Sequence, residues 1–181
     1  PLLGKYQNRN IYVAKSGGCS LGVRDINYHL AGFEKLGAKN FLTRGYVKII
    51  SRNGLKGSTY KFPKVTVTGT ANLIMASIFL KGEQLLKNIS IEPEVIDLIN
   101  FLNNSGAKIE FLRNRTIRIK GVKELISANH KIIGDRIEAF SYLCVGAITK
   151  GNVKVLGVDP NFLKSELKVL KKMGCKILIG K

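Results

Sequence analysis

One pattern recurs three times along the chain and restricts the folds that the chain can adopt. An apolar, helix-like stretch ends each time in glycine, a small residue and lysine. The three copies are residues 33–39, 102–108 and 170–176. Their glycines are Gly37, Gly106 and Gly174, which are 69 and 68 residues apart. This self-similarity predicts a structure built from repeated units of about 68 residues.

Hydrophobic periodicity predicts the elements within each unit. Alternation of apolar and polar residues around Val47, Ile49, Ile117 and Ile119 is typical of half-buried strands. The expected helices cover residues 25–36, 70–80, 92–104, 136–149 and 160–173. Strands are also expected after Gly151 and at residues 175–178. The order strand, helix, strand, helix and two-stranded return makes the fold class α/β (α+β).

Two apolar runs, residues 73–80 and 142–148, are too short to cross a membrane, which takes about 20 residues. We interpret both as buried helices. With three cysteines and no signal-like segment, the sequence favours a reducing, cytoplasmic setting. Because Pro1 stands where an initiator methionine is expected, we expect the chain to be a fragment of a longer protein.

The chain is strongly basic, with 30 Lys and Arg against 12 Asp and Glu and a net charge of +18. This balance favours an anionic partner, which could be nucleic acid, a membrane surface or a phosphorylated substrate. The basic residues are scattered, however, and the densest group is Lys168, Lys171 and Lys172, with Lys176 beyond. Frequent isoleucine, lysine and asparagine indicate a compositional bias, which we take to explain most of the charge.

A glycine-rich loop with a cysteine, residues 15–24, breaks the core-building pattern. Three glycines free its backbone, as a loop that closes over a ligand requires. Cys19 lies between Lys15 and Arg24 and shortly before a helix N-terminus, and both influences favour the thiolate. We predict a reactive thiol there; the alternative is a small residue packed under the loop.

The remaining candidates are weaker. Residues 64–70 join a strand to a helix and offer a lysine and hydroxyls to an anion, although a solvated turn explains them nearly as well. Cys144 and Cys175 are predicted to be inert core residues. His29 and His130 are isolated in the sequence and no Cys or His pair has zinc spacing, so we expect no metal. Acidic residues at Glu92 and Asp135 are interpreted as helix-start residues.

The cysteine loop and the segments after it resemble the UDP-N-acetylglucosamine 1-carboxyvinyltransferase family, enolpyruvyl transferases of peptidoglycan synthesis. The matching segments, in order, are residues 17–24, His29, 32–38, 64–67, 92–97, 117–122 and 135–138. The resemblance extends over essentially the whole chain. The cysteine loop is its specific part, because the sister enzyme that acts on shikimate phosphate shares the fold and lacks that loop.

The resemblance implies an inside-out α/β barrel of two domains, each made of three β-α-β-α-β-β units. Residues 1–133 would then be part of the catalytic-loop domain, and residues 134–181 would begin the second. The implied reaction moves the enolpyruvyl group of phosphoenolpyruvate to the 3′-hydroxyl of UDP-N-acetylglucosamine and releases phosphate. The resemblance implies no metal, no organic cofactor, no nucleic acid and no membrane insertion, and it names no protein partner.

The resemblance also assigns site residues. Cys19 would donate a proton to the enolpyruvyl methylene carbon, could bond covalently to the intermediate, and would be alkylated by fosfomycin. Arg24 would meet an anionic end of phosphoenolpyruvate or the nucleotide. The residues expected along the uridine are Asp25, Ile26, Asn27 and Tyr28. The residues expected along the diphosphate and sugar are Lys64, Val65, Thr66 and Val67.

Four positions depart from the family pattern. Asp25, Asn27, Thr68 and Ile91 stand where the family usually has proline, aspartate, glycine and arginine. Asn27 keeps an acceptor oxygen but loses the charge, which predicts weaker or rearranged nucleotide contacts. Because other family site residues lie outside these 181 residues, we expect the isolated chain to be inactive and the activity to belong to the longer protein. The alternatives are a nucleic-acid-binding module and a catalytically dead repeat protein.

Overall fold

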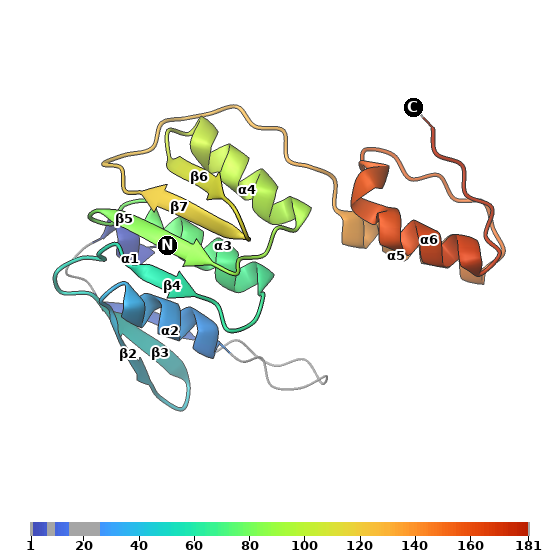
Figure 1. The fold of residues 1–181 in the computed structure, drawn as a ribbon. Coiled ribbons are helices and arrows are strands. Elements are labelled where there is room, and N and C mark those ends of the chain that lie inside the picture. The colour runs from blue at the N-terminus through green and yellow to red at the C-terminus, as the bar shows by residue number, and fades with distance from the viewer. Residues whose placement is uncertain (1, 7–9, 15–25, 181) are drawn as a thin grey trace. The chain divides into compact units, whose positions relative to one another are not determined.

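The computed structural model describes residues 2–6, 10–14 and 26–180 (Figure 1). The chain divides into two compact units, residues 1–130 and 131–181. The elements of the first unit are α1 (Leu2–Lys5), β1 (Asn10–Ala14), α2 (Asn27–Lys35), β2 (Lys39–Leu42), β3 (Tyr46–Ile50), β4 (Thr59–Lys61), α3 (Val67–Ser77), β5 (Glu83–Lys87), α4 (Pro93–Asn104), β6 (Lys108–Leu112) and β7 (Thr116–Lys120). The assignment of the two units to the family's two domains stays a prediction.

Elements β4 to β7, with their two helices, form one complete β-α-β-α-β-β repeat, as the sequence predicts. Their four strands make one sheet in the order β4-β5-β7-β6. Strand β4 pairs parallel with β5, from Thr59 opposite Leu85 to Lys61 opposite Lys87. The other two pairings are antiparallel. Helices α3 and α4 lie on one face of this sheet (Figure 1).

A second sheet reproduces the later part of the same repeat. Its order is β1-β3-β2, and both pairings are antiparallel, as they are in β5-β7-β6. Helix α2 stands between β1 and β2 in the chain, where α4 stands between β5 and β6. Val47 and Ile49 on β3 are buried like Ile117 and Ile119 on β7, so the predicted alternation is confirmed in both sheets.

The repeated glycine has one structural role in all three copies. Gly37, Gly106 and Gly174 have φ values of 90°, 93° and 92°, in the region that favours glycine. Each follows a helix C-cap, and its N–H donates to the carbonyl three residues earlier, at 2.9, 2.9 and 3.0 Å. The next N–H donates to the carbonyl five residues earlier in every copy. These bonds define the Schellman motif, so the sequence repeat marks one recurrent helix ending.

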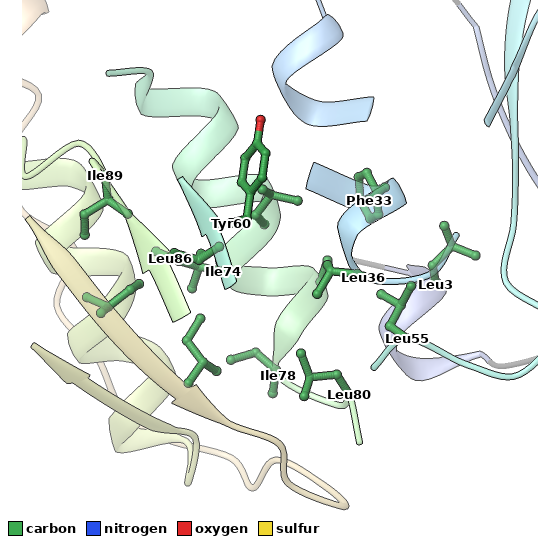
Figure 2. Close-up of a cluster of buried hydrophobic side chains, with 14 of the residues drawn as sticks. Leu3, Phe33, Leu36, Leu55, Tyr60, Ile74, Ile78, Leu80, Leu86 and Ile89 are labelled. Atoms are coloured by element: carbon green, nitrogen blue, oxygen red, sulfur yellow. The ribbon is translucent and has the colours of Figure 1, made fainter. Parts of the chain in front are cut away.

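The core of the first unit is centred on α3, whose side chains are apolar on nearly every side. Leu73, Ile74 and Ala76 have no exposed surface, and α3 packs against α1, α2 and α4 (Figure 2). Buried polar side chains on it are satisfied: the Ser77 hydroxyl donates to the Leu73 carbonyl at 2.7 Å. The prediction that residues 73–80 form a buried helix is confirmed, although α3 itself ends at Ser77.

The second unit contains α5 (Arg136–Ile148), a 3-10 turn (Pro160–Leu163) and α6 (Lys164–Lys172). Both helices agree with the predicted ranges. The Asp135 carboxylate caps α5 by accepting from the Ile137 and Glu138 N–H groups at 2.7 and 3.1 Å, as predicted.

Three expectations for the second unit are wrong. Residues 151–180 contain no strand, because a strand needs ladder hydrogen bonds to a neighbour and these residues have none. The run 142–148 is not buried, since Tyr142, Val145 and Ile148 are 57%, 51% and 84% exposed. Cys144 and Cys175 are free and half-buried instead of belonging to a core. Helices α5 and α6 and the 3-10 turn between them bury one small cluster, around Ala139, Leu163 and Leu167.

The helix ending at Gly106 can be tested by substitution. Gly106→Ala should lower the free energy of unfolding by about 1–2 kcal/mol, because an L side chain is strained at this φ. Gly45→Ala is the matched control: a Cβ there meets no described atom within 4 Å, so its effect should stay within about 0.5 kcal/mol. Urea unfolding curves measure both, and equal midpoints for the two variants would contradict the assignment.

Candidate functional site

The predicted site residues fall into two groups. Cys19, Arg24 and Asp25 lie outside the described residues, so their roles stay predictions. The described ones occupy the N-terminal ends of two helices. Ile26, Asn27 and Tyr28 begin α2, and Lys64, Val65, Thr66 and Val67 lead into α3.

Helix α2 begins without a side-chain cap. Ile26 is the N-cap residue, and its carbonyl accepts from the N–H groups of His29 and Leu30 at 3.0 and 3.1 Å. Its side chain and that of Tyr28 are half-buried against the core, whereas Asn27 is exposed. In this segment, therefore, a ligand could meet the Asn27 side chain and the backbone of its neighbours.

Helix α3 begins with a threonine cap. The Thr66 hydroxyl oxygen accepts from the Gly69 N–H at 3.2 Å, and Thr66 itself is extended, with φ −143° and ψ 127°. Its carbonyl accepts from the Thr70 hydroxyl at 2.6 Å. The cap starts the helix at Val67, three residues before the predicted start at Thr70. Lys64 and Val65 are exposed beside this end, while Val67 packs on the core.

The structure brings these two helix starts together. Asn72 Nδ2 on α3 lies 3.0 Å from His29 Nδ1 on α2. The hydroxyl of Tyr60, the central residue of β4, donates to the Tyr28 carbonyl at 3.0 Å. Sequence reasoning missed these contacts, since hydrogen bonds between residues 43 and 32 positions apart leave no local pattern.

The helix starts also share one electrostatic character. Each presents backbone N–H groups and the positive end of a helix dipole, which favour an anion. Exposed Lys64 adds a full positive charge at the start of α3. Burial lowers the pKa of His29 below 6.5, so at neutral pH its ring is uncharged. Burial, and then the neighbouring Tyr28, raises the pKa of Tyr60 above 10.0, which keeps its hydroxyl a donor.

Other polar groups of the described residues serve the fold. His130 pairs through Nε2 with Asp97 Oδ1 at 2.9 Å, a contact that the sequence did not predict. Glu92 is the N-cap residue of α4, with Pro93 following, as the sequence predicts. Within residues 2–6, 10–14 and 26–180, no three His, Cys, Asp or Glu side chains gather as a metal site would require.

A family model for EPSP synthase (3-phosphoshikimate 1-carboxyvinyltransferase) matches residues 1–181. The chain belongs to the EPSP synthase family. Within this family it resembles proteins named UDP-N-acetylglucosamine 1-carboxyvinyltransferase. The one from Pelagibacter ubique (strain HTCC1062) is 44% identical over 181 residues, which cover 100% of this chain and 43% of that protein. The one from Solibacter usitatus (strain Ellin6076) is 45% identical over 91% of this chain and 40% of its own length.

Solved structures of enolpyruvyl transferases have a similar fold. The enolpyruvyl transferase NikO from Streptomyces tendae superposes with a TM-score of 0.68 at 20% identity, covering 84% of this chain and 40% of that one. EPSP synthase from Acinetobacter baumannii gives a TM-score of 0.66 at 20% identity, covering 96% and 40%. The predicted fold class and the resemblance are confirmed. The chain spans about two fifths of the length of the relatives that it matches.

Within the described part of the chain, no helix has the length and apolar character to span a membrane.

The cap of α3 gives a first test. Thr66→Ala should lower the free energy of unfolding by about 1 kcal/mol, because the Gly69 N–H loses its acceptor. Thr66→Ser keeps the hydroxyl and should recover most of the loss. Thr68→Ala, at an exposed position in the same turn, is the control and should change stability by less than about 0.5 kcal/mol. Urea unfolding midpoints measure all three, and equal losses for the alanine variants would exclude the cap.

The pKa of His29 gives a second test. Because that pKa is lower in the folded chain than the ordinary 6.5, neutral His29 stabilises the fold fully above pH 6.5, and this contribution is lost as the pH falls below 6.5. From about pH 8 to about pH 5, the free energy of unfolding should therefore fall more steeply for the wild type than for His29→Gln. Parallel pH profiles of stability for the two proteins would contradict this prediction.

Proposed function

We propose that the protein containing this chain transfers the enolpyruvyl group of phosphoenolpyruvate to the 3′-hydroxyl of UDP-N-acetylglucosamine and releases phosphate. One observation carries the proposal. Segments 26–28 and 64–67 are far apart in the sequence, but hydrogen bonds hold the helix starts that contain them next to each other. Identity of 44–45% to proteins bearing the name of this activity supports it. The reaction is the first committed step of peptidoglycan synthesis, which would place the protein in the cytoplasm.

The two helix starts would hold different ends of the nucleotide sugar. Residues 25–28 lie along the uridine, where the exposed Asn27 amide and the neighbouring backbone supply hydrogen bonds. Lys64 and the N-terminus of α3 hold the diphosphate, because both favour negative charge. The Thr66 hydroxyl accepts from Gly69 yet keeps its own proton, so it can still donate to a phosphate or sugar oxygen. Val65 and Val67 contribute backbone groups along the same path.

Cys19 would supply the proton for the chemistry, and Arg24 would hold an anionic group of a substrate. Proton transfer from the thiol to the methylene carbon of phosphoenolpyruvate makes the adjacent carbon electron-poor. The sugar 3′-oxygen attacks that carbon as its hydroxyl proton passes to a base of the longer protein that lies outside these residues. Loss of phosphate, with return of one methyl proton to the Cys19 thiolate, then restores the double bond in the product. The proposal requires no metal, no organic cofactor and no nucleic acid; its small-molecule partners are the two substrates.

The test uses the full-length protein. With phosphoenolpyruvate present, we expect phosphate release to depend on UDP-N-acetylglucosamine and not on shikimate 3-phosphate. Fosfomycin should add once, to Cys19, with the nucleotide sugar enhancing the reaction, while Cys144 and Cys175 serve as internal controls. Cys19→Ser should abolish the adduct. Intact-mass analysis and peptide mapping locate it.

Two results would reject the proposal. Phosphate release driven by shikimate 3-phosphate would assign the protein to the sister activity. Absence of both turnover and the Cys19 adduct would indicate a repeat protein that has kept the fold without the chemistry.

A further inference from the structure

Two hydrogen bonds connect the proposed binding segments, and the proposed chemistry makes no use of them. The first joins Asn72, in the second turn of α3, to His29, in the first turn of α2, across 3.0 Å. Both side chains are half-buried. Each lies within a few residues of one segment, since His29 follows Tyr28 directly and Asn72 follows Val67 by five positions.

The atoms of this bond fix its direction. An amide nitrogen has no lone pair free to accept, so Asn72 Nδ2 donates and His29 Nδ1 accepts. The His29 ring is therefore neutral and carries its proton on Nε2. The bond needs this protonation state and tautomer, because a proton on Nδ1 would face a second donor.

The second bond fixes the backbone of the α2 segment. Tyr60 is buried and its ring packs edge-on against Phe62, with the ring centroids 4.9 Å apart. Phe62 is held in turn, since its N–H donates to the Lys87 carbonyl at 3.0 Å and its carbonyl accepts from Asn88 Nδ2 at 2.8 Å. The Tyr60 hydroxyl thus reaches the Tyr28 carbonyl from a well-held strand, four residues before Lys64.

Apolar packing sets how close the two helices lie but leaves their register less defined. Gly32 of α2 faces Leu73 of α3, and a Cβ on Gly32 would overlap the Leu73 side chain, so the helices approach closely here. Apolar contacts are non-directional, whereas a hydrogen bond weakens steeply when its angle changes. The His29–Asn72 bond lies one turn before this contact on α2, toward the helix starts that carry the segments.

We propose that the His29–Asn72 pair, with Tyr60 as its second support, is a positioning device that holds segments 26–28 and 64–67 at the spacing needed to bind one nucleotide sugar at both ends. The inference rests on the proposed function. Because the pair pre-organises binding groups and touches no reacting atom, its loss should weaken nucleotide-sugar binding and leave the chemical step unchanged.

The test measures kinetics of the full-length protein with four variants: Asn72→Ala, His29→Phe, the double variant and Asn72→Asp. Asn72→Ala and His29→Phe should each raise KM for UDP-N-acetylglucosamine about fivefold, as expected from the loss of one net hydrogen bond. The double variant should show no further increase, because both changes remove the same bond. Asn72→Asp should stay near the wild-type KM, since its carboxylate accepts from a protonated His29 Nδ1. KM for phosphoenolpyruvate and kcat should change less than about twofold.

His130→Phe is the matched control. It makes the same substitution at a histidine that lies against α4, where it pairs with Asp97 at 2.9 Å and its ring contacts Phe101, and which makes no described contact with either segment. Thermal unfolding of every variant separates lost stability from lost binding. We expect His130→Phe to lower the melting temperature and to leave KM for the nucleotide sugar unchanged.

The outcomes separate the two proposals. The positioning role alone would be overturned if the wild type is active and the single variants keep its KM for UDP-N-acetylglucosamine. It would also be overturned if kcat falls in those variants while this KM stays constant. Additive effects in the double variant would also overturn it. A wild-type protein that neither binds nor turns over UDP-N-acetylglucosamine would overturn the proposed function, and the positioning role with it.

Discussion

Burial of α3 is the constraint on which the rest of the first unit depends. A helix that is apolar on nearly every side must be covered on nearly every side, and each fully buried Leu or Ile contributes about 1.5–3 kcal/mol. The structure covers α3 with α1, α2, α4 and the four-stranded sheet. Gly4 and Gly32 permit the close approach of α1 and α2, because a Cβ on either would overlap Ala76 or Leu73. Helix α3 is therefore enclosed, and the four-stranded sheet lies outside it.

This arrangement explains why the candidate site lies at a helix end. Most of α3 is packed in the core, but Lys64 and Val65 just before its N-terminus are exposed, beside the start of α2. A buried bond anchors this end, since the Thr70 hydroxyl oxygen accepts from the Ser90 N–H at 3.0 Å. The protein thus has a rigid interior that presents a polar end, which is the support that a precise binding site requires.

The sequence predicted the architecture better than the contacts of the site. The glycine repeat and the strand alternation predicted the β-α-β-α-β-β unit because a helix ending and a half-buried strand each leave a local signature. The partners of His29 and His130 could not be predicted, since Asn72 and Asp97 are 43 and 33 residues away and become neighbours through packing. The strand expected at 175–178 failed for a related reason: apolar alternation shows that residues can form a strand, not that a neighbour is present.

The start of α3 shows how a local signal can mislead. Apolar spacing predicted that the helix begins at Thr70. In the structure Thr66 caps the helix earlier, and Gly69 is part of its first turn. A glycine in a helix is unfavourable in isolation, and here the helix is stabilised by the packing of the residues that follow.

The parallel pairing of β4 with β5 has a consequence for the order in which the chain folds. Strands β6 and β7 are joined by a short turn, so their pairing closes a small loop and can form in microseconds. Strand β4 meets β5 only after α3 has crossed between them, which closes a much longer loop at greater entropic cost. We therefore expect β4 to dock late. Since β4 carries Tyr60 and leads directly into residues 64–67, the binding end would be among the last parts of the unit to take its final shape.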